Sequence, residues 1–409
     1  MYKRWISFLL AVILLLGLMP SGVKAEPVPA ESVYTQNLII RWGENGENLW
    51  ERWYDPEAGD YGGDPAEALP EGVSWADNVL TLNGADLWRV EIYHFGYTPL
   101  TIRVEGENSI RCGDEHALGI IGCFDVALEG EGALALASPK VPFYISDYDP
   151  ATERSCPDAG LTIRDVTVHA ENTRDKGEFT SERTWEFSAV SLETNVTIQG
   201  ARLELRGHDG LSVRGDLSIG GGAEIDADGF YVMARWKDNQ DEAAGWYPST
   251  AVIADARLRI RPYGIKGEND FFTFDIMPGC TMTVQEGADI LVDCSDTAAD
   301  WHGFIVHDDF TEKMTPGGLY MEGGRIEVHS SPVDGYPGFH VATGAEYYQS
   351  GGEIEVYEYN KDVGVSVWDD ALFEMTGGSM AIHARVNGMG VGNRDVWNHY
   401  GGDISIRLA

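Results

Sequence analysis

The chain has 409 residues, 43% of them hydrophobic, with 49 glycines and only 17 prolines, so it can bury a continuous core. Its 66 acidic and 29 basic residues give a formal net charge of −37. A surface this acidic repels nucleic acid and anionic membranes, which excludes binding to their phosphates, and it attracts divalent cations.

The first 25 residues are expected to be an export signal and not part of the fold. Lys3 and Arg4 form a charged start, residues 6–19 are apolar, and Val23-Lys24-Ala25 offers a small-residue cleavage site. The apolar run is short for a membrane span of about 20 residues. Three of the 29 basic residues lie here, so the mature chain has 26 basic against 66 acidic residues, a net charge of −40. We predict a secreted protein, extracellular or loosely associated with the cell surface, without stable membrane insertion after cleavage.

Residues 26–75 are acidic and aromatic and lack the repeat that follows them. A solenoid needs its open end covered, so we interpret this segment as an N-terminal cap. A small separate binding module is the alternative, although about 45 residues are marginal for an independent core.

Two short phrases recur between residues 76 and 409. The first reads glycine, apolar, any residue, valine, and its copies begin at Gly210, Gly229, Gly303, Gly338, Gly364 and Gly388, with a degenerate copy at Gly119. The second is a pair of segments with period-two alternation, such as Val196-x-Ile198 followed by Leu203-x-Leu205. Such alternation predicts strands with one buried face. Gly-Gly pairs at 323, 351, 377 and 401 separate the two segments and are 28, 26 and 24 residues apart.

One repeat is therefore three short strands and three corners, with about 24 to 35 residues per turn. A propeller blade needs four longer strands, and a leucine-rich horseshoe fits poorly because no ordinary helix interrupts the pattern. We predict an all-β parallel β-helix over residues 76–409, with apolar ladders inside and about twelve coils stacked about 4.8 Å apart. Parallel crossovers are right-handed in nearly all proteins, so the helix should be right-handed.

Three insertions into the repeat are candidates for binding, because function in a solenoid lies on insertions and stacked turns. They span residues 141–159, 233–250 and 293–316 and combine aromatic with acidic residues. Exposed aromatic rings are flat apolar faces on which sugars stack, while neighbouring carboxylates accept hydroxyl hydrogens. The ligand-binding candidates are Trp236, Trp246, Tyr247, Trp301 and His307. The alternative is that these aromatic residues cover the ends of core ladders.

Acidic residues also recur in one register. The positions five residues after the first-phrase glycines are Asp308, Thr343, Asp369 and Asn393, and Asp309 and Asp370 stand beside the two acids. Equal register places such residues in one stacked file, with Asp308 and Asp369 two coils, or about 10 Å, apart. Calcium–oxygen bonds are about 2.3–2.6 Å long. We therefore predict separate weak calcium sites at the two Asp pairs, completed by loop carbonyls; solvated turn acids are the alternative.

The five cysteines are Cys112, Cys123, Cys156, Cys280 and Cys294, and an odd number leaves at least one of them unpaired or paired between chains. The pairs Cys112/Cys123 and Cys280/Cys294 could bridge neighbouring walls, but we favour buried thiols over a disulfide framework.

No residue can be assigned a catalytic role. Gly207-His208-Asp209-Gly210 is similar to a Gly-His-Gly element of β-helix hydrolases, but no Asp-Asp or Arg-x-Lys element stands at a suitable distance from it, so we expect a turn. Arg235 and Lys237 are the best candidates for the base of a lyase. Phosphate chemistry is disfavoured because lysine and arginine are scarce.

Residues 73–136 carry the clearest sequence similarity to a known family. It contains VSWADNVLTLNGA at 73–85, LTIRVEGENSI at 100–110 and VALEGEGAL at 126–134. These segments resemble a family of exported β-helix proteins of anaerobic Gram-positive bacteria, described as carbohydrate-binding-domain proteins. The resemblance implies a pectate-lyase-like solenoid that binds acidic plant polysaccharide with calcium.

The sequence thus predicts a monomeric, secreted β-helix that binds polysaccharide with the help of calcium, and it leaves catalysis unassigned. A polysaccharide lyase or glycoside hydrolase of the β-helix type is one alternative. A structural or adhesion protein of the cell surface is the other.

Overall fold

A computed structural model describes residues 36–41, 49–55, 60–62, 69–93, 99–149, 154–175, 184–236, 246–263, 271–296, 301–307, 314–333, 337–360, 363–392 and 394–408. Only the backbone is described at 36–41, 49–55, 60–62, 93, 149, 154–155, 184–185, 236, 271 and 301–302. The chain divides into two compact units, Met1–Thr35 and Gln36–Ala409. The predicted export signal falls in the first unit, outside the described residues. None of the helices in the described ranges is long and apolar enough to cross a membrane.

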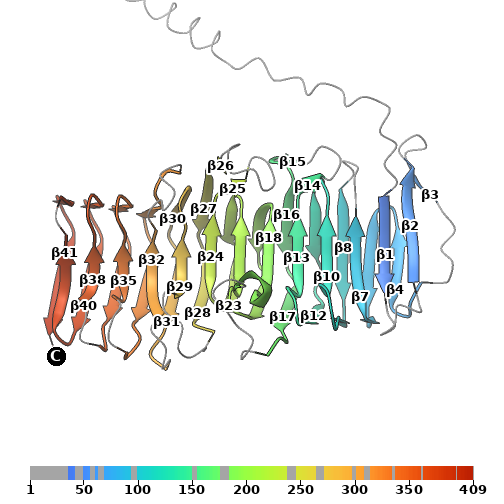
Figure 1. Cartoon of the computed structure of the whole chain (residues 1–409), viewed down its shortest axis with the longest axis horizontal. Helices are drawn as coiled ribbons and strands as arrows, with labels where there is room; N and C mark the ends of the chain where they lie inside the picture. The colour runs from blue at the N-terminus through green and yellow to red at the C-terminus, as the bar shows by residue number, and fades with distance from the viewer. Residues whose placement is uncertain are drawn as a thin grey trace, which may run out of the picture. The chain divides into compact units, whose positions relative to one another are not determined.

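Three long sheets make up the unit Gln36–Ala409 (Figure 1). Sheet A has the order β3 (Asp60–Gly62), β2 (Leu49–Asp55), β1 (Gln36–Arg41), β7 (Arg89–Tyr93), β10 (Leu118–Ile121), β13 (Phe143–Ser146), β18 (Val190–Glu193), β21 (Leu211–Arg214), β24 (Phe230–Met233), β29 (Phe271–Ile276), β32 (Trp301–Val306), β35 (Phe339–Val341), β38 (Val363–Val367) and β41 (Asn387–Val391).

Sheet B has the order β4 (Val73–Ala76), β5 (Val79–Asn83), β8 (Leu100–Glu105), β11 (Val126–Glu129), β16 (Gly160–Arg164), β19 (Asn195–Gln199), β22 (Leu217–Gly220), β27 (Ser249–Ile253), β30 (Cys280–Val284), β33 (Gly318–Met321), β36 (Glu346–Gln349), β39 (Leu372–Met375) and β42 (Val396–His399).

Sheet C has the order β6 (Asp86–Leu87), β9 (Glu107–Arg111), β12 (Ala133–Ser138), β17 (Thr167–Asn172), β20 (Arg202–Arg206), β23 (Ala223–Asp228), β28 (Ala256–Arg261), β31 (Ala288–Asp293), β34 (Arg325–His329), β37 (Glu353–Tyr357), β40 (Ser379–Ala384) and β43 (Asp403–Leu408). Outside these sheets lie two short hairpins, β14 (Tyr148–Asp149) with β15 (Arg154–Ser155) and β25 (Arg235–Trp236) with β26 (Trp246–Tyr247), and a 3-10 turn, η2 (Thr184–Phe187).

From β5 onward each coil supplies one strand to each sheet, and each of these strands pairs in parallel with its equivalent in the next coil; β20, β23 and β28 of sheet C are an example. Sheet C contains twelve strands, all paired in parallel. The predicted parallel β-helix of about twelve coils is therefore confirmed. Its right-handed sense stays a prediction from general crossover rules.

The two sequence phrases occupy different walls. The first phrase forms sheet A, where Phe304, Phe339, Val365 and Met389 are paired along successive coils. The second phrase forms sheets B and C, one alternating segment in each. The degenerate copy is out of register, because the position of Leu211 corresponds to Leu118 through Val190 and Phe143. Gly119 therefore lies two positions beyond the file of the phrase glycine Gly210.

Apolar ladders fill the interior, as the period-two pattern predicts. Phe230, Phe274, Phe304 and Phe339 stack on sheet A with centroids 4.5, 4.4 and 5.1 Å apart, and all four are 0% exposed. A second stack on sheet B runs through Tyr347, Phe373 and Trp397, with centroids 4.5 and 4.0 Å apart. Aromatic contacts of this kind each contribute about 0.5–1.5 kcal/mol beyond the area they bury, so the ladders stabilise every coil interface.

The Gly-Gly corners between sheets B and C require glycine for two reasons. Gly352 has a φ of 69°, and a Cβ placed on it would lie 2.5 Å from the carbonyl oxygen of Gly323 in the preceding coil. The buried amide of Gln349 donates to the carbonyls of Gly351 and Gly352, both at 3.2 Å, which satisfies the corner backbone. A side chain at this corner would push successive coils apart.

At the N-terminal end the pairing changes from parallel to antiparallel. Strand β1 pairs antiparallel with both β2 and β7, β2 with β3, and β4 with β5. The described strands of the predicted cap, residues 26–75, thus extend sheets A and B within the unit Gln36–Ala409. The role of the segment as a cap stays a prediction.

Neither candidate cysteine pair forms, and the favoured interpretation of buried thiols holds for three of the five cysteines. Cys123 is bonded to Cys156, with Cα atoms 5.5 Å apart, while Cys112, Cys280 and Cys294 are buried free thiols. The β14–β15 hairpin returns Cys156 to the wall that carries Cys123. Cys280 and Cys294 cannot pair because one begins a strand of sheet B and the other follows a strand of sheet C. Burial is the main reason that the pKa of Cys294 rises to about 12, so this thiol stays protonated.

Candidate functional site

The second insertion brings three of the predicted ligand-binding residues together. Strands β25 and β26 form an antiparallel hairpin in which Trp236 pairs with Trp246 and Arg235 with Tyr247. Tyr247 is 37% exposed and Trp246 is half-buried. The side chain of Trp236 lies outside the described residues. The hairpin thus places three aromatic residues on one short ribbon.

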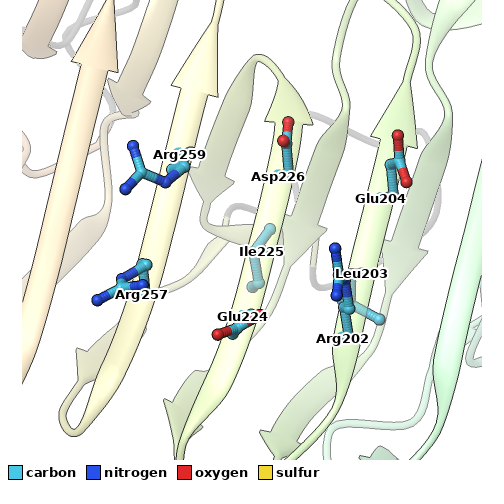
Figure 2. A pocket seen from close by; sticks show the side chains of 8 residues that line it. All are labelled: Arg202, Leu203, Glu204, Glu224, Ile225, Asp226, Arg257 and Arg259. Atoms are coloured by element: carbon cyan, nitrogen blue, oxygen red, sulfur yellow. The ribbon is translucent and has the colours of Figure 1, made fainter.

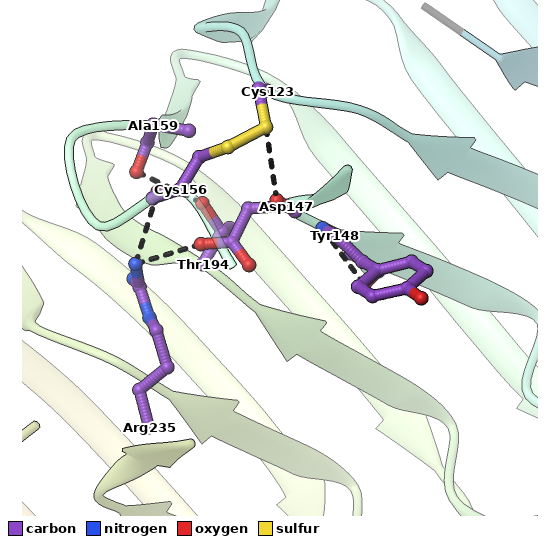
Figure 3. Close-up of a disulfide and its surroundings, with 8 residues drawn as sticks. Cys123, Asp147, Tyr148, Cys156, Ala159, Thr194 and Arg235 are labelled. Atoms are coloured by element: carbon purple, nitrogen blue, oxygen red, sulfur yellow. Dashed lines mark hydrogen bonds and ion pairs between the residues drawn. A yellow bond between two sulfur atoms is a disulfide. The ribbon is translucent and has the colours of Figure 1, made fainter. Parts of the chain in front are cut away.

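Arg235, a predicted lyase base, is taken up by a buried ion pair. Its guanidinium is 2.7 Å from Asp147 of the first insertion, and their side chains are 5% and 2% exposed. It also donates to the carbonyl of Cys156 at 3.2 Å (Figure 3). A further hydrogen bond goes to the amide oxygen of Asn195 at 2.8 Å. A buried guanidinium that is engaged by three partners is not open to a substrate proton. These contacts count against Arg235 as a base; Lys237 lies outside the described residues.

This ion pair has a structural consequence that no spacing in the sequence reveals. Asp147 and Arg235 belong to different insertions, so the two hairpins are held against one another beside the Cys123–Cys156 disulfide (Figure 3). Removing one partner of such a pair leaves an uncompensated buried charge, which is strongly destabilising. The first two insertions therefore share one side of the β-helix.

The third insertion places its candidates less favourably for direct contact with a ligand. Trp301 begins β32, and its side chain lies outside the described residues. His307 follows β32 and is 3% exposed, with its ring edge on Phe272 at 4.7 Å and its Nε2 4.0 Å from Asp275. A ligand could reach His307 only by displacing the residues that cover it. Trp368, in the same region of sheet A, is 55% exposed and packs edge-on against His340 at 4.7 Å.

The strands that precede the predicted acid file have the expected register. Val306, Val341, Val367 and Val391 are paired along sheet A, so the positions that follow them correspond. Asp308 and Asp309 lie outside the described residues. Asp369 and Asp370 form the turn after β38, where Asp370 has a φ of 63° and is 2.8 Å from Arg394. Within the described ranges, no three His, Cys, Asp or Glu side chains are grouped to hold a metal ion. Calcium binding stays a prediction.

His208 lies in the bend between β20 and β21, where the sequence predicts a turn. The imidazole is 2% exposed, its Nδ1 contacts Asp209, and the other carboxylate oxygen of Asp209 accepts from the Ser188 hydroxyl at 3.0 Å. These contacts hold the bend and leave His208 away from solvent.

The outer face of sheet B carries a site that the sequence interpretation missed. Tyr320 of β33 and Tyr348 of β36 are paired in register, and their rings stack with centroids 4.7 Å apart and planes 19° apart. A groove of about 180 Å³ runs over them. We call it the tyrosine groove; its lining is Tyr320, Met321, Glu322, Tyr348, Gln349, Ser350, Glu374 and Thr376.

Polar groups surround the two rings. The Tyr320 hydroxyl donates to Glu346 at 3.3 Å, and the amide of Asn398 donates to Glu374 at 3.4 Å. Partial desolvation, together with nearby carboxylates, raises the pKa of both tyrosine hydroxyls, so they remain hydrogen-bond donors at neutral pH. Glu374 is the register partner of Tyr348 in the next coil. The face of Tyr348 turned toward that coil meets a carboxylate and not a third ring.

The sequence did contain a sign of this site. Tyr320 and Tyr348 are the middle residues of Leu319-x-Met321 and Tyr347-x-Gln349, and they are 28 residues apart, as are the adjoining Gly-Gly pairs. A middle residue of such a segment points outward. Examining these outward positions, in addition to the insertions, would have found the pair.

A second groove lies on the outer face of sheet C and is built from charges (Figure 2). It has a volume of about 320 Å³, and we call it the arginine groove; its lining is Arg202, Leu203, Glu204, Glu224, Ile225, Asp226, Arg257 and Arg259. Arg206, beside it, contacts Glu204 at 2.8 Å and Asp226 at 2.9 Å, and Arg261 also contacts Asp226. Burial would raise the pKa of Asp226, but hydrogen bonds from Arg206 and Arg261 outweigh it and lower the pKa. The charges of Glu204 and Asp226 are thus already paired with arginines of the protein.

No family model, curated protein or solved structure matches this chain. The resemblance to exported carbohydrate-binding β-helix proteins therefore stays a prediction from residues 73–136. What the molecule does must be argued from its own surfaces.

Proposed function

We propose that this protein is an exported glycan-binding β-helix and that the tyrosine groove holds one sugar ring of a polysaccharide. The observation that supports the proposal is the stacked pair Tyr320 and Tyr348, half-buried on the outer face of sheet B with carboxylate and amide groups around it. Both tyrosines are partly exposed, and the core beneath them is already filled by buried residues such as Leu319, Met321 and Tyr347, so the two rings are not needed to fill it.

The groove fits the two requirements of a sugar. The solvent-exposed part of the Tyr348 ring offers an apolar surface for the C–H side of a pyranose ring. Glu374, Thr376 and the amide of Asn398 offer acceptors and donors for its hydroxyls. At about 180 Å³ the groove is smaller than the roughly 300–1,000 Å³ of a pocket for a drug-sized ligand. One ring of a chain, lying along an open wall, is the natural occupant.

The charge of the groove bears on the kind of sugar. Glu322, Glu346 and Glu374 lie at or beside the two rings and would repel a uronate carboxylate. The groove therefore favours a neutral, hydroxyl-rich polysaccharide. Binding of an acidic polysaccharide with calcium, as the sequence predicted, requires a cation to bridge these carboxylates to the sugar acid, and a chelator would abolish it.

The test is binding of the full chain to insoluble neutral polysaccharides and to immobilised acidic ones, with and without a chelator. We expect Tyr348→Ala to weaken binding about tenfold, because the stacking face is lost. The matched control is Tyr357→Ala on sheet C, which removes a tyrosine stacked on His329 and His383 at 4.6 Å and should leave binding unchanged.

Each outcome bears on a different alternative. Wild-type binding in Tyr348→Ala would exclude the tyrosine groove as the site. Release of reducing ends or of unsaturated products would establish a hydrolase or a lyase. Absence of binding to every glycan would favour a structural or adhesion role.

A further inference from the structure

The last coil, made by β41, β42 and β43, has an apolar end that the preceding coil does not have. Val391, Ile406 and Leu408 are 50%, 49% and 63% exposed. Their register partners in the preceding coil, Val367, Ile382 and Ala384, are 0%, 0% and 1% exposed. Residues that belong to the interior ladders by position are thus open to solvent on one side. Burying such area would contribute about 25 cal/mol per Å².

The same coil is also the edge of all three sheets. Sheet A ends at β41 (Figure 1), and sheets B and C end at β42 and β43. Each of these strands has one side without a neighbouring strand among the described residues. Exposed edges present rows of backbone donors and acceptors that template further pairing, and proteins usually protect them with charges, bulges or covering segments.

Charge does not protect this edge. Residues 387–408 contain two arginines and two aspartates, so their net charge is zero in a chain of −37. The rest of the molecule repels a second copy, whereas this coil does not. The last coil therefore combines an apolar surface, three strand edges and electrical neutrality.

Strand β43 is self-complementary when it is turned around. Its sequence from 403 to 407 is Asp-Ile-Ser-Ile-Arg. In an antiparallel pair centred on Ser405, Asp403 lies opposite Arg407 of the other copy, and Ile404 lies opposite Ile406. Opposite charges directly across a strand pair are stabilising, and this arrangement makes two such pairs.

We propose that two copies of this chain associate end to end through their last coils. The interface is isologous, with β43 pairing antiparallel with its counterpart about a twofold axis at Ser405. The same axis brings β41 of each copy over β42 of the other, so that the apolar ladders continue across the junction. The inference does not depend on the proposed glycan site, and it replaces the monomer that the sequence suggested.

The experiment measures the mass of the full chain in solution by light scattering and sedimentation over a range of concentrations. The wild type should approach twice the mass of one chain. Asp403→Arg and Arg407→Asp should each weaken association at least tenfold, because each places like charges opposite one another twice. An equal mixture of the two variants should recover the dimer, since the arginines at both positions of one variant then face the aspartates at both positions of the other.

The mixture guards against a trivial loss of folding, because misfolded variants would not rescue one another. The double variant Asp403→Arg/Arg407→Asp should likewise dimerise with itself. A wild type that is monomeric at every concentration overturns the proposal. The proposal is also overturned if both single variants dimerise as tightly as the wild type. Two weakened variants that stay monomeric when mixed would overturn it as well.

Discussion

The outer faces of sheets B and C differ in chemistry although they are built by the same backbone repeat. The central outward file of sheet B, from β8 to β42, is Thr101, Ala127, Thr162, Thr197, Ser218, Val252, Thr283, Tyr320, Tyr348, Glu374 and Asn398. The matching file of sheet C is Asp86, Ser109, Ala135, His169, Glu204, Asp226, Arg259, Leu291, Glu327, Glu355, Ala381 and Ser405.

Sheet B has one charged residue in its file and sheet C has six, and the charges on sheet C are largely paired with one another. Arg325, for example, lies 2.6 Å from Glu327 and 2.9 Å from Glu355. A face whose charges are paired internally offers little to a ligand and stabilises the wall. A face with hydroxyls and two partly exposed rings leaves its hydrogen-bonding groups for a partner. The difference separates a structural wall from a binding wall.

The largest loss of stability should come from a cavity in the core beneath sheet B. The outer faces of sheets B and C both depend on this core, so such a variant should affect both of them. Phe373 is 0% exposed and lies between Tyr347 and Trp397. We expect Phe373→Ala to cost about 3–5 kcal/mol of unfolding free energy, from lost burial and the cavity left behind. Urea denaturation measures the loss, and glycan binding should fall with it.

Phe373→Leu is the matched control for this cavity, because it keeps most of the apolar volume and should cost much less. A variant Phe373→Ala with wild-type stability would contradict the ladder as a source of stability.

On acidification, sheet A and sheet C should lose their stabilising contributions over different pH ranges. Burial, with His307 nearby, lowers the pKa of His340 to about 4, against about 6.5 in an unfolded chain. Its stabilising contribution is complete above about pH 6.5 and is lost as pH falls toward 4, because the unfolded chain binds the proton first. The expected loss is about 2–3 kcal/mol. Urea denaturation across this range measures it, and His340→Gln should flatten the slope.

The paired acids of sheet C respond at lower pH. Hydrogen bonds lower the pKa of Asp226 and of Glu355, so their stabilisation is present above their unfolded pKa of about 4 and is lost below it. If stability were flat from pH 6.5 to 4 in the wild type, the buried His340 could not be neutral in the folded state.

The smallest loss of stability should come from Arg206, which joins several carboxylates on sheet C. This variant tests whether the paired charges of sheet C act separately from the binding face of sheet B. Arg206, with its side chain 29% exposed, contacts Glu204, Asp226 and Asp228. We expect Arg206→Ala to cost about 1–2 kcal/mol, more than an isolated surface pair because three carboxylates share it. Glycan binding at the tyrosine groove should be unchanged. Thermal unfolding and the binding assay together measure both.

Arg202 provides the control for that variant. It lies in the arginine groove, and no ion pair engages its side chain in the part of the chain that the structure describes. Arg202→Ala should change stability by less than about 0.5 kcal/mol. Equal losses in the two variants would show that general positive charge, and not the paired network, stabilises sheet C.

Much of the fold could be predicted because the alternation of apolar residues in each coil shows which positions point inward. Val196-x-Ile198 and Leu203-x-Leu205 both occupy the interior, as alternation requires, and the corner glycines mark where one wall ends. The degenerate phrase at Gly119 misled because its coil has Ala117, and not a glycine, at the position of the phrase glycine, so apolar residues alone fix the register there. The candidate site was predicted less well: the three aromatic residues of the second insertion do come together, but the groove with the clearest geometry lies on a wall.

The sequence by itself determined the period, the inward face and the three-walled coil, since all three follow from local alternation and from glycine at tight corners. Only the tertiary structure decided that Asp147 meets Arg235, that Cys123 meets Cys156 and that Tyr320 stacks on Tyr348 with Glu374 beyond. Those contacts join residues about 26 to 88 positions apart, at distances set by insertion lengths and by stacking of whole coils. A local pattern fixes which way a side chain points. The residue that this side chain contacts depends on the number of residues in the turns and insertions of each coil.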